Sequence, residues 1–170
     1  MKTAEVSTVV YLPRAEVFAF LRDFPRYADY SKYLEGVEQT GDGGPGTAYR
    51  LQFRWWVLSY TAHTRVTSVD PPDRLDWTVT RDLHASGRWE LEATTPPPDR
   101  EAATRVRFVV DYDPGAVGSH LVDLPRLVSF DRVVDRVQDL IVEEGERVVE
   151  RIVRDLEGES REVDLRVETR

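Results

Sequence analysis

The sequence predicts an α+β domain in which a curved antiparallel sheet wraps around one long C-terminal helix. Two patterns predict this class. From Tyr49 to Tyr112, apolar and polar residues alternate with a period of two, which is typical of strands with one face in the core. From Leu127 to Leu156, apolar residues instead recur at intervals of three and four, the spacing of an amphipathic helix.

The N-terminal segment predicts a strand followed by two short helices. Residues 5–12 are rich in β-branched and aromatic side chains, which favours a strand. Pro13 suits the first turn of a helix, and apolar residues at helical spacing follow until Pro25 ends it. A second short helix is expected over residues 26–34.

Turn-forming residues divide the middle of the chain. The glycine cluster at 41–46 and the Asp-Pro-Pro-Asp sequence at 70–73 are strong turn signals, and the proline-rich segment 95–100 predicts a loop. The expected strands between these breaks are residues 49–55, 60–69, 75–79, 87–93 and 106–112.

The alternation also predicts which side chains face the core. Aromatic rings supply large apolar areas, and each Tyr or Trp adds one polar group, which suits an apolar pocket with a few orienting hydrogen bonds. Taken alone, the residues favour a completely filled core over a pocket. The predicted core-facing set is Tyr49, Leu51, Phe53, Trp55, Tyr60, Trp77, Trp89, Leu91, Val106, Phe108, Val110 and Tyr112.

A carboxylate and a glycine interrupt the apolar face of the long helix. On a helical wheel Glu144 and Gly145 fall among the apolar positions. One hypothesis is that Gly145 leaves room for a ligand and that Glu144 points into a cavity, where it can act as a general acid or base. The alternative is that Glu144 turns to the rim and pairs with an arginine such as Arg147 or Arg151.

Composition excludes several classes of function. The chain has 170 residues, enough for one domain, and no cysteine, so it has neither disulfides nor thiolate chemistry. Its net charge of −8 argues against nucleic acid, because phosphate recognition needs a basic surface. From these residues we expect neither a secretory signal nor an integral membrane segment. We therefore expect a soluble, cytoplasmic protein, either monomer or homodimer, for which transient membrane contact stays open.

No motif for a cofactor or a metal is found. Nucleotide-binding, P-loop, nucleophile-elbow and zinc-protease patterns are all missing from the sequence. Strand parity places His63 and His84 on the outer face. His120 and Asp123 are close enough to meet on a helix, but two ligands do not make a metal site. We predict no cofactor and no metal.

The outer face of the sheet is expected to be polar. Acidic residues at Asp76, Glu90 and Glu92 lie among arginines, which predicts cross-strand ion pairs on a wet surface. These arginines are Arg50, Arg54, Arg65, Arg88, Arg105 and Arg107.

Two further segments point to interaction surfaces. The run from Trp55 to Leu58 places apolar residues on both faces of a hairpin, so part of it should be exposed. In the tail, residues 159–170, Val163, Leu165 and Val167 alternate with charged residues. This tail is either an added strand or a disordered end.

The order of several local sequences resembles a known superfamily. "VSTVVYLPRAEVFAFLRDFPRY", "GDGGPGTAYRLQF", "SVDPPDRLDWTV" and "GRWELEATTPPPDREAATRVRFVVDY" follow one another as in START-like (SRPBCC) proteins, over about residues 3–157. The polyketide cyclase/dehydrase and ubiquinone-binding branch is the most similar. The resemblance implies a helix-grip fold for residues 1–158. In that fold a curved seven-stranded antiparallel sheet has two short helices after its first strand, and a long C-terminal helix packs across it.

The resemblance also implies a function. Members usually hold lipids, sterols, polyketides or quinones in a deep cavity between sheet and helix, and they share no catalytic motif. We therefore predict binding or transport of a hydrophobic small molecule; a cyclase/dehydratase-type enzyme that uses Glu144 and a protein-interaction module are the alternatives. The predicted cavity residues are Tyr49, Leu51, Phe53, Tyr60, Trp77, Trp89, Phe108, Tyr112, Val137, Ile141, Glu144, Gly145 and Val148.

Overall fold

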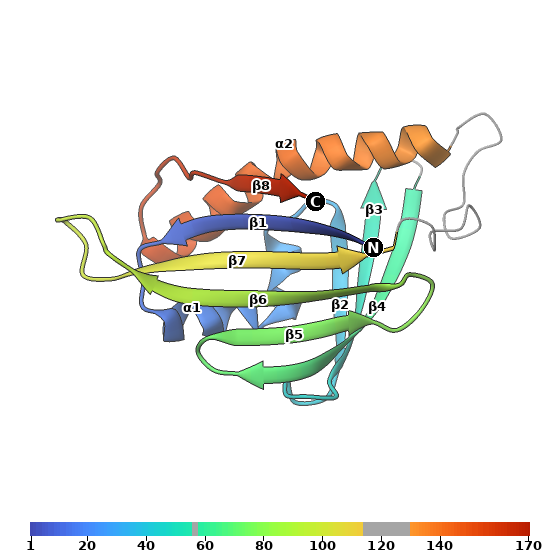
Figure 1. Cartoon of the computed structure of the whole chain (residues 1–170), viewed down its shortest axis with the longest axis horizontal. Coiled ribbons are helices and arrows are strands. Elements are labelled where there is room, and N and C mark those ends of the chain that lie inside the picture. The colour runs from blue at the N-terminus through green and yellow to red at the C-terminus, as the bar shows by residue number, and fades with distance from the viewer. Residues whose placement is uncertain (56–57, 114–129) are drawn as a thin grey trace.

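A computed structural model describes residues 1–55, 58–113 and 130–170, with only the backbone for Leu58 and residues 130–142. It contains one eight-stranded antiparallel sheet, ordered β2-β3-β4-β5-β6-β7-β1-β8 (Figure 1). The elements are β1 (Lys2–Val10), α1 (Arg14–Leu21), the 3-10 helix η1 (Phe24–Asp29), β2 (Leu34–Thr40), β3 (Ala48–Trp55), β4 (Leu58–Asp70), β5 (Arg74–Val79), β6 (Ala85–Thr94), β7 (Ala103–Tyr112), α2 (Phe130–Glu157) and β8 (Arg166–Thr169).

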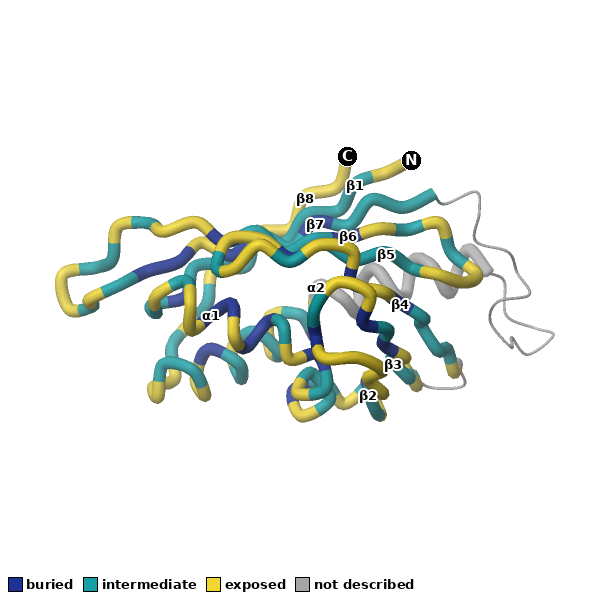
Figure 2. The backbone as a smooth tube through the Cα atoms, turned by 90° about the horizontal axis from the view of Figure 1, so that it is seen from below, coloured by how far each residue is buried: buried dark blue, intermediate teal, exposed yellow. Residues whose placement is uncertain are grey.

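The predicted architecture is confirmed. Strands β2–β4 curl away from the direction of β5–β7, so the sheet is curved (Figure 1). Helices α1 and α2 lie on the same face of this sheet, which we call the inner face (Figure 2). Within the described residues, no helix has the length and apolar character needed to cross a membrane.

The segment after α1 differs from its prediction. The helix expected over residues 26–34 is the shorter 3-10 helix η1, which has Pro25 in its first turn, and Leu34 already begins β2. Periodicity did not reveal β2 because its register shifts between Leu34 and Gly36, which breaks the alternation.

The tail supplies a strand beyond the seven that were predicted. Strand β8 pairs antiparallel with β1, with Val6 opposite Val167. The apolar residues just before β8 hold the tail in place: Val163 packs against the core and Leu165 lies beside α2. Residues 166–169 of the tail therefore belong to the sheet.

Ion pairs cover the outer face, as the sequence predicts. Glu90 is contacted by Arg74, Arg88 and Arg107 at 3.5, 2.8 and 3.0 Å. Arg107 also forms two hydrogen bonds with Glu5, and these lower the pKa of that carboxyl. The network joins four strands, β5, β6, β7 and β1.

Candidate functional site

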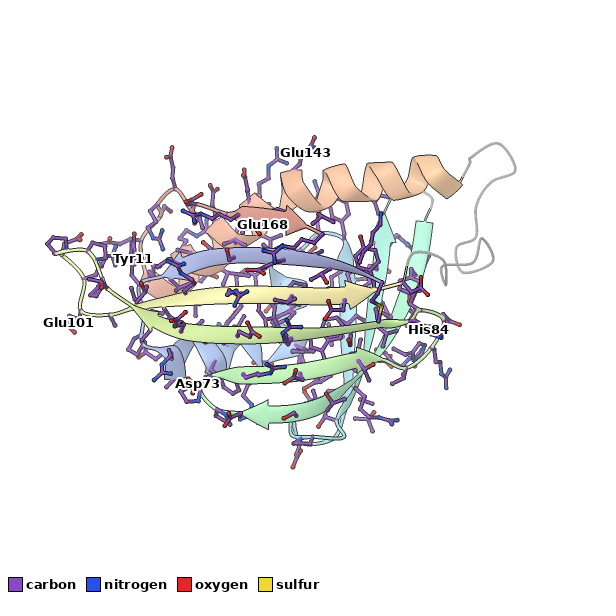
Figure 3. The ribbon with its side chains drawn as sticks, viewed as in Figure 1. Tyr11, Asp73, His84, Glu101, Glu143 and Glu168 are labelled. Atoms are coloured by element: carbon purple, nitrogen blue, oxygen red, sulfur yellow. The ribbon has the colours of Figure 1, made fainter. Side chains whose placement is uncertain are left out.

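The inner face of the sheet has two ends that differ in packing. On β1 and on β3 to β7, the inner face has a buried residue toward α1 and half-buried residues farther along the strand; among the latter, Phe53 is exposed, whereas Thr64 and Gly87 are buried. We call these the closed end and the open end; in Figure 3, Asp73 marks the closed end of β5 and His84 follows its open end. The buried residues are Val10, Tyr49, Val66, Leu75, Leu91 and Val106, and the half-buried ones are Val6, Leu51, Ala62, Trp77, Trp89 and Phe108.

The closed end is filled by aromatic side chains. The rings of Phe24 and Tyr49 lie 4.5 Å apart between centroids, and those of Phe20 and Tyr30 lie 5.5 Å apart. Tyr27 stacks between the two phenylalanines and donates its hydroxyl to the Leu21 carbonyl. Burial raises the pKa of Tyr27 well above its ordinary value. This end is an ordinary close-packed core.

The open end presents a continuous aromatic surface that is only half-covered. Phe108 stacks with Trp77 at 6.0 Å and lies 4.4 Å from Trp89. Trp77 lies flat because its cross-strand partner is Gly87; a Cβ there would be 2.2 Å from the Trp77 ring. The glycine therefore shapes this surface by lacking a side chain.

Two hydroxyl groups on the inner face of β4 lack hydrogen bonds. The Tyr60 and Thr64 side-chain oxygens are buried, yet neither has a partner among the described residues. Burial raises the pKa of Tyr60. A buried polar atom without a partner is costly and requires an explanation, such as a ligand or an ordered water.

Glu144 is buried and surrounded by cations. Its side chain is 7 % exposed, and its carboxylate lies 3.4 Å from Arg147, 3.6 Å from Arg151 and 3.8 Å from Lys32. Arg151 also donates to the Tyr30 carbonyl at 2.8 Å, which ties α2 to the segment after η1. The arginine pairing of our alternative is therefore present, but the carboxylate is buried rather than at the rim.

The space beside Gly145 is filled by a residue of the C-terminal tail. A Cβ added there would lie 3.6 Å from Leu165 of the tail. The tail therefore packs against the position where we expected this glycine to leave room for a ligand. The tail's alternating pattern was the signal that could have revealed this.

The other predicted cavity residues lie on both sides of the boundary between packed and open surface. Tyr49 is fully packed, Val148 of α2 is half-buried against the core, and Phe53 is 37 % exposed at the open end. Tyr112 is half-buried at the end of β7. The side chains of Val137 and Ile141 lie outside the described residues.

The remaining predictions concern the histidines and the hairpin. His84 is exposed and His63 is half-buried on the outer face, as parity predicts. His120, Asp123, Trp56 and Val57 lie outside the described residues. Among the side chains that the structure describes, no three His, Asp or Glu residues converge as metal ligands.

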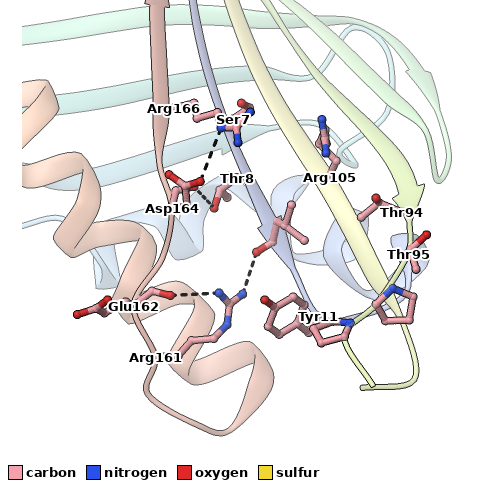
Figure 4. A pocket seen from close by; sticks show the side chains of 13 residues that line it. Ser7, Thr8, Tyr11, Thr94, Thr95, Arg105, Arg161, Glu162, Asp164 and Arg166 are labelled. Atoms are coloured by element: carbon pink, nitrogen blue, oxygen red, sulfur yellow. Dashed lines mark hydrogen bonds and ion pairs between the residues drawn. The ribbon is translucent and has the colours of Figure 1, made fainter. Parts of the chain in front are cut away.

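The sequence did not predict a pocket on the opposite, outer face at the closed end. It has a volume of about 540 Å³ and lies over β1, between the tail and the adjoining ends of β6 and β7 (Figure 4). Periodicity could not locate it, because one wall is the tail.

A buried ion pair fixes the tail beside this pocket. The Glu157 side chain is 0 % exposed and accepts hydrogen bonds from Arg161 at 2.8 and 2.9 Å and from the Tyr11 backbone N–H at 3.1 Å. Arg161 also donates to the Val9 carbonyl and lies 3.9 Å from the Tyr11 ring. Burial alone would raise the pKa of Glu157, but these hydrogen bonds outweigh it and the pKa is lowered.

The sheet curved around a long helix defines a START-like (SRPBCC) protein, and comparisons with known proteins agree. Residues 1–129 match the family described as "Polyketide cyclase / dehydrase and lipid transport". The chain belongs to this family. No match was found among curated protein sequences.

Three solved structures illustrate the shared fold. The Zhui aromatase/cyclase from Streptomyces sp. R1128 is 18% identical, with a TM-score of 0.66 over 92% of this chain and 94% of that one. A protein from Thermus thermophilus is 16% identical, with a TM-score of 0.65 over 92% and 97% of the two chains. A START superfamily protein from Mycobacterium smegmatis is 17% identical, with a TM-score of 0.62 over 92% and 99%. Identities this low establish the fold alone.

Proposed function

We propose that this protein binds an apolar small molecule on the open end of the inner face, between the sheet and α2. One observation carries the proposal: Trp77, Trp89 and Phe108 form a continuous aromatic surface that the protein leaves half-covered, although each strand packs tightly at its other end. An apolar ligand would remove this surface from water, at roughly 25 cal/mol for each Å² buried.

The unpartnered hydroxyls support a ligand with one or two polar atoms. Tyr60 and Thr64 lie on one face of β4, separated by Ala62 on the same face. A carbonyl or hydroxyl group on the ligand would accept the hydrogen bonds that these hydroxyls do not make. Lipids, quinones and polyketides all combine an apolar body with such groups.

The first test is native mass spectrometry of freshly purified protein, with an organic extract analysed in parallel. We expect a bound apolar molecule, or saturable binding from a panel of quinones, sterols and fatty acids that quenches tryptophan fluorescence. A protein that purifies empty and leaves its fluorescence unchanged across this panel would refute the proposal.

A pair of glycine variants tests the location. Gly87→Ala should push the Trp77 ring from the sheet into the proposed ligand space, and weaken ligand binding roughly tenfold. Gly36→Ala is the matched control, because its Cβ would meet only a flexible Gln52 side chain at 3.5 Å. Equal affinity in the two variants would place the ligand elsewhere.

An enzymatic role is the second candidate, and Glu144 favours it. Its Oε1 atom is buried and receives no hydrogen bond from the described residues, with the Arg151 guanidinium 3.6 Å away, so it keeps capacity to accept a hydrogen bond from a substrate. With polyketide-like compounds as candidate substrates, Glu144→Gln should abolish turnover and leave binding within a factor of about three. Binding without turnover in the unmodified protein would instead support a carrier.

A further inference from the structure

The pocket on the outer face is a second candidate site, separated from the proposed apolar site by the thickness of the sheet. Its floor is the outer side of β1, where Val9 is the register partner of Arg105 on β7. Its volume of about 540 Å³ falls within the range of small-molecule sites.

The pocket is held in shape from both sides. On one side the Glu157–Arg161 pair and the Thr8 hydroxyl, which donates to the Asp164 carbonyl at 3.1 Å, fix the tail to β1. On the other side β6 and β7 are paired along their whole lengths, up to Thr94 opposite Ala103. A ligand would therefore meet walls that need little reordering, which favours binding.

The charge in the pocket that lacks a partner is positive. Arg161 is neutralised by Glu157, and Arg166 lies 3.6 Å from Asp164. Figure 4 shows the carboxylate of Glu162 pointing away from the pocket. Arg105 lines the pocket and has no ion pair with any described residue. An oxyanion beside Arg105 would therefore complete the charge balance.

Neutral groups around Arg105 suit the same ligand. The Ser7, Thr94 and Thr95 hydroxyls line the pocket and make no hydrogen bonds within the described part of the chain, so they are free to donate. Pro96 and Pro97 add an apolar patch next to them.

From this geometry we propose that the outer pocket binds a small organic oxyanion, a carboxylate or phosphate with a compact apolar group. Arg105 contacts the anion, hydroxyls from β1 and the end of β6 complete its hydrogen bonds, and the apolar group lies on the prolines. This site is independent of the apolar site, because the two lie on opposite faces of the sheet.

Calorimetric titration of the full chain with phenyl phosphate tests the proposal. We expect saturable binding that Arg105→Gln weakens roughly tenfold or more, because a charge-assisted contact is lost. The matched control is Arg65→Gln, which removes another exposed arginine without a described ion pair, on β4 and outside the pocket. It should bind like the unmodified protein.

Two results would overturn the proposal. One is the absence of saturable binding, and the other is equal weakening by Arg105→Gln and Arg65→Gln, which would indicate general charge attraction. Circular dichroism should show both variants folded, since both arginines are exposed. Apolar-ligand binding measured on the same variants should not change, so failure of this proposal is separable from failure of the proposed function.

Discussion

The closed and open ends of the inner face belong to the same strands but differ in what covers them. At the closed end, α1 and η1 bring Phe20, Phe24 and Tyr27 down onto the sheet, and Val153 of α2 is 1 % exposed. At the open end, rings of similar size are left half-covered. The alternation of the strands is the same at both ends, so the difference comes from the elements that pack on them.

This difference in packing between the two ends suits the proposed binding function. A fully packed end can supply the stability of the fold, which leaves the other end free to keep apolar surface for a ligand. Stability and binding should then respond to different substitutions.

The largest expected effect compares two phenylalanines. Phe24→Ala removes a ring that is 4 % exposed and should lower the free energy of unfolding by about 3–5 kcal/mol. Phe53→Ala removes one that is 37 % exposed and should cost less than about 2 kcal/mol. Urea denaturation measures both values. Equal costs would mean that the two ends are packed alike.

The next largest effect on stability concerns the Glu157–Arg161 ion pair, which fixes the tail. Glu157→Gln leaves Arg161 without its carboxylate and should cost roughly 1.5–3 kcal/mol in urea denaturation at neutral pH. Glu162→Gln is the control, because Glu162 is exposed and its carboxylate points away from the pocket (Figure 4), so the substitution should change stability little. Similar losses in both variants would show that the Glu157 pair contributes nothing particular.

The same pair predicts a dependence on pH. The folded-state pKa values of Glu157 and Glu5 lie below their ordinary value of 4.5, so both groups stabilise the fold above about pH 4.5. This stability is lost as the pH falls through the lowered values. Denaturation curves from about pH 7 to about pH 3 should therefore show that the free energy of unfolding decreases less for Glu157→Gln than for the unmodified protein. An equal decrease in both would mean that Glu157 does not contribute to the pH dependence.

The smallest expected effect is an increase in stability. Gly145→Ala should stabilise α2 by up to about 1 kcal/mol, because alanine is the better helix former and the added methyl meets Leu165 at an ordinary distance. A thermal melt would detect it. A loss of stability would mean that the tail packs on α2 more tightly than 3.6 Å suggests.

The sequence predicted what depends on local periodicity. Alternation assigned each of the core-facing strand residues, including Trp77 and Phe108, to one face, and the register confirms it. It could not separate Tyr49, which is packed, from Phe53, which is exposed, because both have the same parity and differ only in what covers them. It likewise could not foresee that the tail would lie over Gly145, since that contact joins distant segments.

The position of β1 has a consequence for how the chain folds. Its two neighbours in the sheet, β7 and β8, follow it at great separation: the Glu5–Arg107 contact spans 102 residues, and the contact of Thr8 with Asp164, just before β8, spans 156. Closing such large loops costs chain entropy before any contact compensates for it, so folds of this kind form slowly. Until then β1 remains an unpaired strand rich in β-branched residues, and molecular crowding or heat during refolding should divert this protein into aggregates through that segment first.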